Sequence, residues 1–341
     1  MKTEIISDPD AFVELREWWN SQPGPMVSPF LRAEWFHAMA VTLLEPDDSL
    51  RLILVQDGAD PVGALPMFRR GRRLRSLTEL STERFDLIHE PNPEVIHRVI
   101  GELTRHPYVR FEALGAGSPL VKSLEAQQRW VVDHETESAD IYLTSSDQVM
   151  ANLSRNLRKN LRRGLRALED MGKIEIVPVT PPDLVPMTLS RALDLEAAGW
   201  KGQAGVAAKQ SPARRRFFTR LSEEAEWLRL GAMYLDDRMI AFNFDLESRG
   251  RIVSLLTSYD EDLPRRCSPG HVLLWKTLEA ASARGVGSYC LGGIGGQNSW
   301  KRQWSKDTTS RCYITGFGSG LAGGLALSAW RARRAVRTLG H

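Results

Sequence analysis

The stretch from residue 227 to residue 291 constrains the fold more than any other part of the chain. It begins with three strand-like segments separated by turn residues, which are Trp227–Leu235, Met239–Glu247 and Arg251–Ser258. An arginine- and proline-rich loop follows, then an apolar helix from about His271 and a short strand, Ser288–Leu291. An antiparallel meander followed by a helix and a returning strand predicts a mixed sheet flanked by helices.

The loop before this helix has the composition of an anion-binding helix start. The first N–H groups of a helix have no internal partner, and the helix dipole makes that end electropositive. A glycine there lets a phosphate or thioester group approach the backbone closely. The alternative is an ordinary turn into a helix. The residues that we predict to bind a donor cofactor are Arg265, Arg266, Ser268, Gly270 and His271.

Residues 146–172 give the clearest helical pattern of the chain. Leucines follow one face, and six cations follow the other, namely Arg155, Arg158, Lys159, Arg162, Arg163 and Arg166. No acid interrupts residues 151–168, so the cations repel one another. A polyanion would relieve this repulsion, whether a phosphorylated substrate, a cofactor phosphate, an acidic carrier protein or RNA. The alternative is a solvated helix face.

The N-terminal part, residues 1–145, gives an α/β pattern. After helical segments, Leu50–Gln56 and Val62–Phe68 predict a β-hairpin, and Phe85–Ile88 predicts a short strand that contains a single acid, Asp86. A helix from Pro93 and further strands follow.

Composition places the chain among soluble globular proteins. Its 341 residues carry a formal net charge of +3, which gives no reason to expect DNA binding. The three cysteines have neither zinc nor disulfide spacing, and no signal region or transmembrane-length apolar run is found. These features predict a cytoplasmic protein that holds no metal ion.

Eight motifs follow one another along nearly the whole chain. They are PFLRAEW (29–35), ALPMFRR (64–70), FDLIHEP (85–91), NLRKNLRRGLRALEDMG (156–172), GWKGQAG (199–205), LDDRMIAFNFDL (235–246), SPGHVLLW (268–275) and SWKRQW (299–304). In this order and spacing the chain resembles the bacterial branch of the GNAT superfamily often called CelD-like or BioF-associated acetyltransferases. That branch is related in fold to the Fem aminoacyl-tRNA-dependent transferases.

The resemblance implies an α/β (α+β) fold with two tandem GNAT-like lobes. We expect the first at residues 1–145, the second, with the acyl-donor site, at 146–320, and a basic helix at 321–341. The usual glycine-rich pyrophosphate signature is absent, so the donor is left open among acyl-CoA, an acyl carrier protein and an aminoacyl-tRNA. The acid that usually precedes the Lys/Arg-Trp motif is also absent, which suggests a different acceptor geometry.

The implied chemistry is transfer of an acyl group to a primary amine of a small molecule, sugar or peptide. The amine must lose a proton, so a base is needed. We predict Glu196 or Asp86 as this base, and the alternatives are a surface acid and a salt-bridge partner. The residues that we predict to face a substrate are Trp200, Lys201, Tyr259, Lys301, Trp304, Arg155 and Lys159.

Two further functions fit the same residues. The first is a Fem-type aminoacyl-tRNA-dependent transferase, and the second is a GNAT-like binding protein without catalysis. The C-terminal segment 321–341 is predicted as a docked basic helix, and weak peripheral contact with an anionic membrane is its alternative role.

Overall fold

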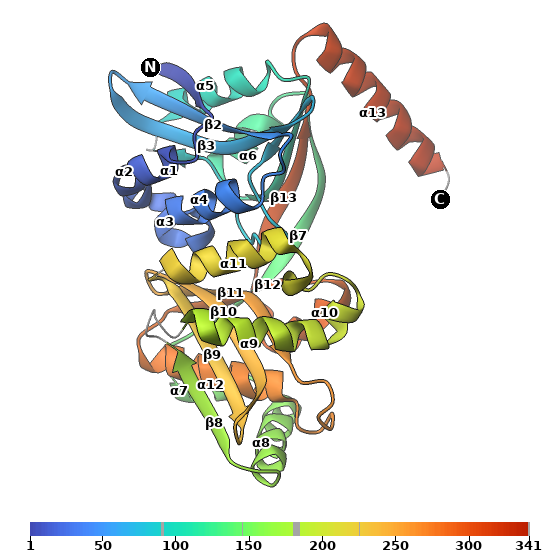
Figure 1. Ribbon diagram of the computed structural model, residues 1–341. Coiled ribbons are helices and arrows are strands. Elements are labelled where there is room, and N and C mark those ends of the chain that lie inside the picture. The colour runs from blue at the N-terminus through green and yellow to red at the C-terminus, as the bar shows by residue number, and fades with distance from the viewer. Residues whose placement is uncertain (90–91, 145, 180–184, 225, 340–341) are drawn as a thin grey trace. The chain divides into compact units, whose positions relative to one another are not determined.

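The chain forms two compact units in the computed structural model, which describes residues 1–89, 92–144, 146–179, 185–224 and 226–339. Unit 1 comprises residues 1–26, 30–136 and 310–341, and unit 2 comprises residues 27–29 and 137–309 (Figure 1). The chain therefore returns to unit 1 at Ser310, after it has completed unit 2. The domain boundaries that the sequence predicts, after residues 145 and 320, remain a proposal about which parts of the chain fold independently.

Unit 1 is built on a mixed sheet. Its strands are, in spatial order, β1 (Lys2–Ile6), β2 (Asp48–Asp57), β3 (Asp60–Arg70), β4 (Arg73–Ser76), β6 (Tyr108–Gly115), β13 (Thr308–Gly316) and the first part of β7 (Trp130–Tyr142), while β5 (Ile88–His89) pairs with β3. Strands β1, β2, β3 and β4 pair in succession in antiparallel fashion, whereas β4 pairs with β6 in parallel. The predicted hairpin is confirmed as β2–β3, whereas β1 and β13 were not predicted.

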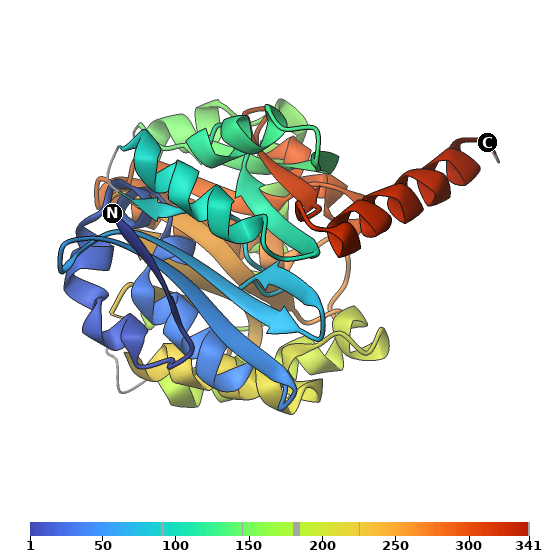
Figure 2. The same cartoon turned by 90° about the horizontal axis from the view of Figure 1, so that it is seen from above.

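Helices cover both faces of the unit 1 sheet. They are α1 (Ala11–Glu14), α2 (Arg16–Ser21), α3 (Pro23–Val27), α4 (Ala33–Thr42), α5 (Pro93–Leu103) and α6 (Pro119–Glu125). A further helix, α13 (Leu321–Leu339), follows β13. Figure 2 shows α5 and α6 on one side of the β2–β3 hairpin and α1 and α4 on the other. Accordingly β2 is buried continuously over residues 52–55, as expected of a strand covered on both faces. The rings of Phe36, Phe85 and Phe111 pack in succession in this core.

The strands of unit 2 also form a mixed sheet, which shares β7 with the strands of unit 1. Its strands are, in spatial order, the last part of β7, then β12 (Ser288–Gly293), β11 (Arg251–Tyr259), β10 (Arg238–Ser248), β9 (Leu228–Leu235) and β8 (Ile174–Val179). The predicted meander is confirmed as β9–β10–β11, and the returning strand β12 runs parallel to β11.

Helices also form a layer on each face of the unit 2 strands. They are α7 (Ser146–Ala151), α8 (Arg155–Glu169), α9 (Val185–Ala198), α10 (Trp200–Gln203), α11 (Pro212–Glu224) and α12 (Pro269–Ala283). Helix α12 packs on β9 to β11 together with α7 and α8, whereas α9 packs on β10 and β11 from the other face (Figure 1). On that other face the Phe218 ring of α11 meets the Phe244 ring of β10.

The single helix predicted over residues 146–172 is wrong, because the structure divides it into α7 and α8. The break falls at Ser154, whose hydroxyl accepts the backbone N–H of Leu157 at 3.2 Å and so begins a new helix. The predicted pattern of faces is confirmed within α8, where Leu157, Leu161 and Leu168 are buried.

Candidate functional site

The parallel strands β11 and β12 of unit 2 pair over only a short distance. Their register joins Arg251 to Ser288, Ile252 to Tyr289, and Val253 to Cys290. Beyond these pairs, the described residues of the two strands form no further ladder, although β11 continues to Tyr259. Separated parallel strands leave main-chain N–H and C=O groups on the edges that face each other. An extended ligand with amide groups can pair with such edges.

A β-bulge lies at the point where the two strands separate. On β10, Phe244 faces Leu256 and the next residue, Asp245, faces Ser254, so Leu255 has no opposite residue. A bulge bends its strand and redirects the neighbouring main-chain groups. The bend therefore explains why β11 leaves β12 directly after Val253.

The start of α12 has no side-chain cap. Its first residue is Pro269, and the preceding Ser268 has a left-handed backbone (φ 44°) and makes no side-chain cap. The Ser268 hydroxyl donates to the Arg265 carbonyl at 2.9 Å instead. No acid lies in the first turn of α12, and Arg265 and Arg266 before it are exposed. The positive end of the dipole is therefore not neutralised by a side chain of the first turn.

Aromatic side chains form the wall beside this helix start. A Cβ added to Gly270 would lie 3.1 Å from Cδ1 of Tyr259, so the absence of a side chain lets the Tyr259 ring pack close to the helix. His271 stacks on Trp304, whose indole Nε1 donates to His271 Nδ1 at 3.0 Å. Burial lowers the pKa of His271, and the indole bond requires Nδ1 to be unprotonated. The neutral imidazole thus has its proton on Nε2 and is suited to donate a hydrogen bond there.

The predicted residues of the GWKG segment lie at the far end of β11. Lys201 Nζ donates to Glu196 Oε1 at 3.1 Å and to the Thr257 carbonyl at 2.9 Å. Burial lowers the pKa of Lys201, and the Glu196 carboxylate offsets part of that effect. The neighbouring Trp200 is 44% exposed, and its backbone N–H donates to Glu261 Oε1 at 3.0 Å.

Glu196 is more enclosed than a surface acid. It is 1% exposed, and its second oxygen, Oε2, accepts the backbone N–H of Ala208 at 2.8 Å. Both carboxylate oxygens are therefore engaged by the protein. This arrangement fixes the position of Lys201, and the catalytic role of Glu196 stays a prediction.

Lys301 lies where β12 ends. Its Nζ donates to the Gly293 carbonyl at 3.0 Å and lies 3.6 Å from the position of a Cβ on Gly292. Gly292 has a left-handed φ of 75°, which explains why glycine occupies this position. The same Cβ position is 3.8 Å from the Ser254 carbonyl of β11, so Lys301 stands near the point of strand separation.

A buried acid that the sequence pattern did not single out lies under the bulge. Asp245 Oδ2 accepts the Tyr289 hydroxyl at 2.9 Å, which ties β10 to β12 across β11. Burial raises the pKa of Asp245 to about 7, against hydrogen bonding from Tyr289, Asn243 and Ser254. An acid within the apolar strand AFNFDL is the same signal that drew attention to Asp86, so this residue could have been found from the sequence.

Asp86, the other predicted base, belongs to unit 1. Its Oδ1 accepts the Ser118 hydroxyl at 2.6 Å and the Leu87 N–H at 2.9 Å, and Arg84 donates to Oδ2 at 3.2 Å. Burial raises the pKa of Asp86, and Arg84 opposes this. The structure therefore gives Asp86 a set of partners within unit 1, and its catalytic role stays a prediction.

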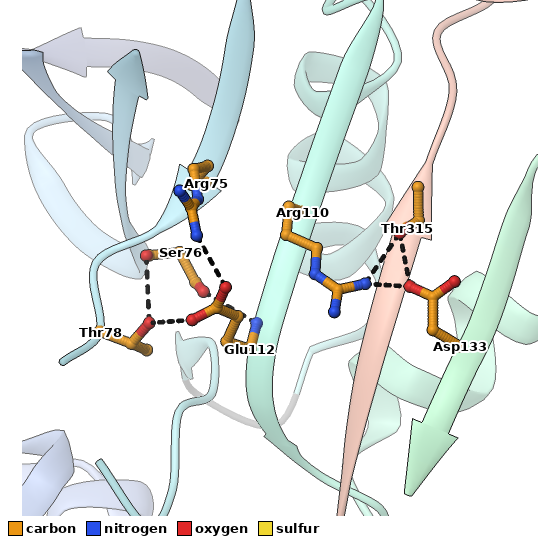
Figure 3. A network of polar contacts seen from close by, with 7 residues as sticks. All are labelled: Arg75, Ser76, Thr78, Arg110, Glu112, Asp133 and Thr315. Atoms are coloured by element: carbon orange, nitrogen blue, oxygen red, sulfur yellow. Dashed lines mark hydrogen bonds and ion pairs between the residues drawn. The ribbon is translucent and has the colours of Figure 1, made fainter. Parts of the chain in front are cut away.

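Unit 1 also has a parallel strand pair, β4–β6, but polar side chains occupy the point where it ends (Figure 3). Ser76 Oγ accepts the Glu112 N–H at 2.9 Å, and Thr78 donates to the Glu112 carboxylate at 3.4 Å. Arg75 donates to the same carboxylate at 2.8 Å. Farther across this sheet, Arg110 pairs with Asp133 and Thr315.

Comparison with known families assigns the class of unit 2. Residues 155–302 match the model of the Acetyltransferase (GNAT) domain, and this stretch lies within unit 2. It contains the strand separation, the bulge and the start of α12. The chain carries a GNAT acetyltransferase domain and is an acyltransferase.

Solved structures share the fold of the whole chain at low identity. A domain of a putative lysylphosphatidylglycerol synthetase from Agrobacterium fabrum has a TM-score of 0.59 and 13% identity, covering 94% of this chain and 96% of its own. A conserved protein of unknown function from Bacteroides thetaiotaomicron has a TM-score of 0.60 and 12% identity, covering 93% and 100%. A tandem GNAT protein of the clavulanic acid pathway has a TM-score of 0.50 and 12% identity, covering 94% and 99%. The fold is thus a tandem GNAT-like one, as predicted.

Two further findings concern relatives and membranes. Curated protein sequences contain no significant match to this chain. Within the described parts of the chain, no helix combines the length and apolarity needed to cross a membrane.

Proposed function

We propose that unit 2 transfers an acyl group from a thioester donor to a primary amine of a small molecule, sugar or peptide. The observation that carries this proposal is the combination at one place of a bulged, separated strand pair and an uncapped helix start. The strand edges suit the amide groups of a pantetheine arm, and the helix start suits its phosphate. The narrower placement in the CelD-like or BioF-associated branch stays a prediction from sequence.

The reaction needs no covalent enzyme intermediate. The amine nitrogen attacks the thioester carbonyl, a C–N bond forms, the C–S bond breaks, and the thiolate leaves. The nitrogen loses one proton and the thiolate gains one, so a base that takes up the first proton can return it to sulfur. A hydrogen-bond donor near the carbonyl stabilises the oxyanion, and the His271 Nε2–H is our candidate.

The site residues divide by position in this proposal. Arg265, Arg266, Ser268 and Gly270 line the donor end, and Tyr259, His271 and Trp304 wall it. The acceptor side comprises Trp200, Lys201 and Lys301, with Glu196 as base.

A donor assay tests the proposal directly. The purified protein is incubated with acetyl-, medium-chain and long-chain acyl-CoA and with acylated carrier protein, each against a panel of amines, and free thiol is measured. We expect amine-dependent thiol release from at least one donor. Absence of release from every donor, with correctly folded protein, would overturn the proposal.

A second candidate function is aminoacyl transfer from tRNA. The cations of α8 favour it, and one structure of the same fold is described as part of a putative lysylphosphatidylglycerol synthetase. In this case product formation depends on charged tRNA and disappears after ribonuclease treatment. Thiol release that is insensitive to ribonuclease would reject this candidate.

A further inference from the structure

The most strongly charged surface of unit 2 is the outer face of α8. We define the basic face of α8 by its exposed cations, which are Arg155, Lys159, Arg162, Arg163 and Arg166. The opposite side of the helix is buried. Among the residues described, none of these five cations forms an ion pair with a carboxylate. The sixth cation, Arg158, turns toward the carbonyls of Met150 and Ala151 instead.

The buried side of α8, opposite the basic face, packs against the start of α12. A Cβ on Gly164 would lie only 2.6 Å from the Cys267 carbonyl oxygen and 3.3 Å from a methyl group of Val272. Glycine therefore lets the α8 backbone contact the loop and first turn that begin α12. Two further exposed cations, Arg265 and Arg266, lie on this loop.

The length of the basic face indicates the size of its partner. Arg155 and Arg166 are 11 residues apart, or about 16 Å along a helix axis. Coenzyme A carries its phosphates on a single nucleotide. Bound at the start of α12, it would leave the cations around Arg155 and Lys159 without a counter-charge. A partner that neutralises the whole face must present negative charges over several helical turns.

We propose that the basic face of α8 docks an acidic helix of an acyl carrier protein. This inference rests on the proposed function, because thioester chemistry needs a pantetheine arm and a carrier protein supplies one from an acidic surface. Carboxylates spaced three or four residues apart on a helix match cations spaced in the same way. The arm then extends from the docked helix along the loop 265–268 to the strand separation beyond Val253.

RNA is the less favoured occupant of the same face. An aminoacyl-tRNA donor carries its acyl group as an oxygen ester and has no pantetheine arm. The main-chain edges of β11 and β12, which suit the amide groups of such an arm, would then have no role in donor binding. The sequence of α8 also contains no aromatic residue on which an unpaired base could stack.

The test separates binding from catalysis. We would compare wild type, R155E/K159E, and the matched control R215E/R216E, which reverses two exposed cations of α11. The probes are a purified acidic acyl carrier protein in its apo and holo forms, a bulk tRNA preparation, and acyl-CoA.

We expect R155E/K159E to raise the Kd of the holo carrier protein about tenfold or more at low salt, with the effect reduced as salt is added. The control variant R215E/R216E should change this Kd less than about twofold. An equal loss in both variants, carrier binding that R155E/K159E does not weaken, or tRNA binding in place of carrier binding would overturn the inference. Loss of thiol release in wild type with every donor would instead reject the proposed function.

Discussion

One helix of each unit begins with a proline, but the two helix starts differ in capping and in charge. In unit 1, α5 begins with an Asn92 cap whose Oδ1 accepts the Glu94 N–H at 2.9 Å, and Glu94 places a negative charge in the first turn. In unit 2, α12 begins after a left-handed Ser268 with no side-chain cap and no acid in its first turn. A capped, acidic start stabilises a helix but repels anions, whereas an open start retains its positive potential.

The parallel strand pairs differ in the same sense. In unit 1, Ser76 and Thr78 supply polar atoms to Glu112 where β4 ends. In unit 2 the bulge at Leu255 separates β11 from β12, and directly beyond their last pair the Gly292 N–H donates to Cys290 Sγ at 3.3 Å, within β12 itself. Both features that could hold a donor thus occur in unit 2.

The largest effect is expected when the first turn of α12 receives an acid like the one in the first turn of α5. Gly270→Asp places a carboxylate in the first turn of α12, where it favours the helix but repels an anionic donor. We expect kcat/KM for the acyl donor to fall about 100-fold or more, as for loss of a main electrostatic contact. The Tm should fall no further than in an uncharged variant of the same size. Steady-state thiol release and thermal unfolding measure the two effects.

Two controls accompany this variant. Gly270→Asn has a similar size without the charge, so it should retain most of the activity that Gly270→Asp loses. Glu94→Gln removes the acid of α5 and should leave kcat/KM unchanged. Equal losses for Asp and Asn at position 270 would show that shape, rather than charge, decides donor binding there.

The buried acids Glu196 and Asp86 sharpen the comparison, since one lies in each unit. Removing one partner of a buried ion pair leaves the other charge uncompensated, so Glu196→Gln should cost about 3 kcal/mol of unfolding free energy. Asp86→Asn should cost less, because Arg84 is partly exposed and can turn to solvent. Denaturant unfolding measures both.

Activity assigns the base independently of stability. If Glu196 only positions Lys201, folded Glu196→Gln protein keeps its kcat and its pH profile. If either acid is the base, its amide variant should lose about 100-fold or more in kcat. The acidic limb of its pH profile should also disappear. A loss of that limb in Asp86→Asn would move the chemistry toward unit 1 and contradict the division of roles between the units.

Much of the fold could be predicted from local pattern, but the decisive part of the site could not. The meander, α12 and the two faces of α8 follow from the spacing of apolar residues within single segments. The bulge at Leu255 depends on how β11 pairs with β10, and the Tyr289–Asp245 bond joins residues 44 positions apart. No local pattern carries such pairings. The break at Ser154 was within reach, because serine before a helical run is a capping signal.

The last expected effect is a pH dependence of stability that comes from Asp245 of unit 2. The pKa of Asp245 rises from an ordinary 3.8 to about 7 in the folded chain. Between about pH 4 and pH 7 the unfolded chain has released this proton while the folded chain keeps it. The unfolding free energy should therefore fall as pH rises through this window, by at most about 1.4 kcal/mol per pH unit from this group. Above pH 7 both states are ionised and the contribution is constant.

Asp245→Asn should remove this slope, since asparagine does not titrate and can still accept the Tyr289 hydroxyl. Unfolding free energies of wild type and variant, measured from pH 4 to pH 8, give the slope as their difference. Ser76→Ala in unit 1 is the matched comparison: it removes a neutral acceptor from the Glu112 N–H, so it should cost about 1 kcal/mol at every pH. An unchanged slope in Asp245→Asn would mean that the Asp245 carboxyl group does not titrate near neutrality in the folded chain.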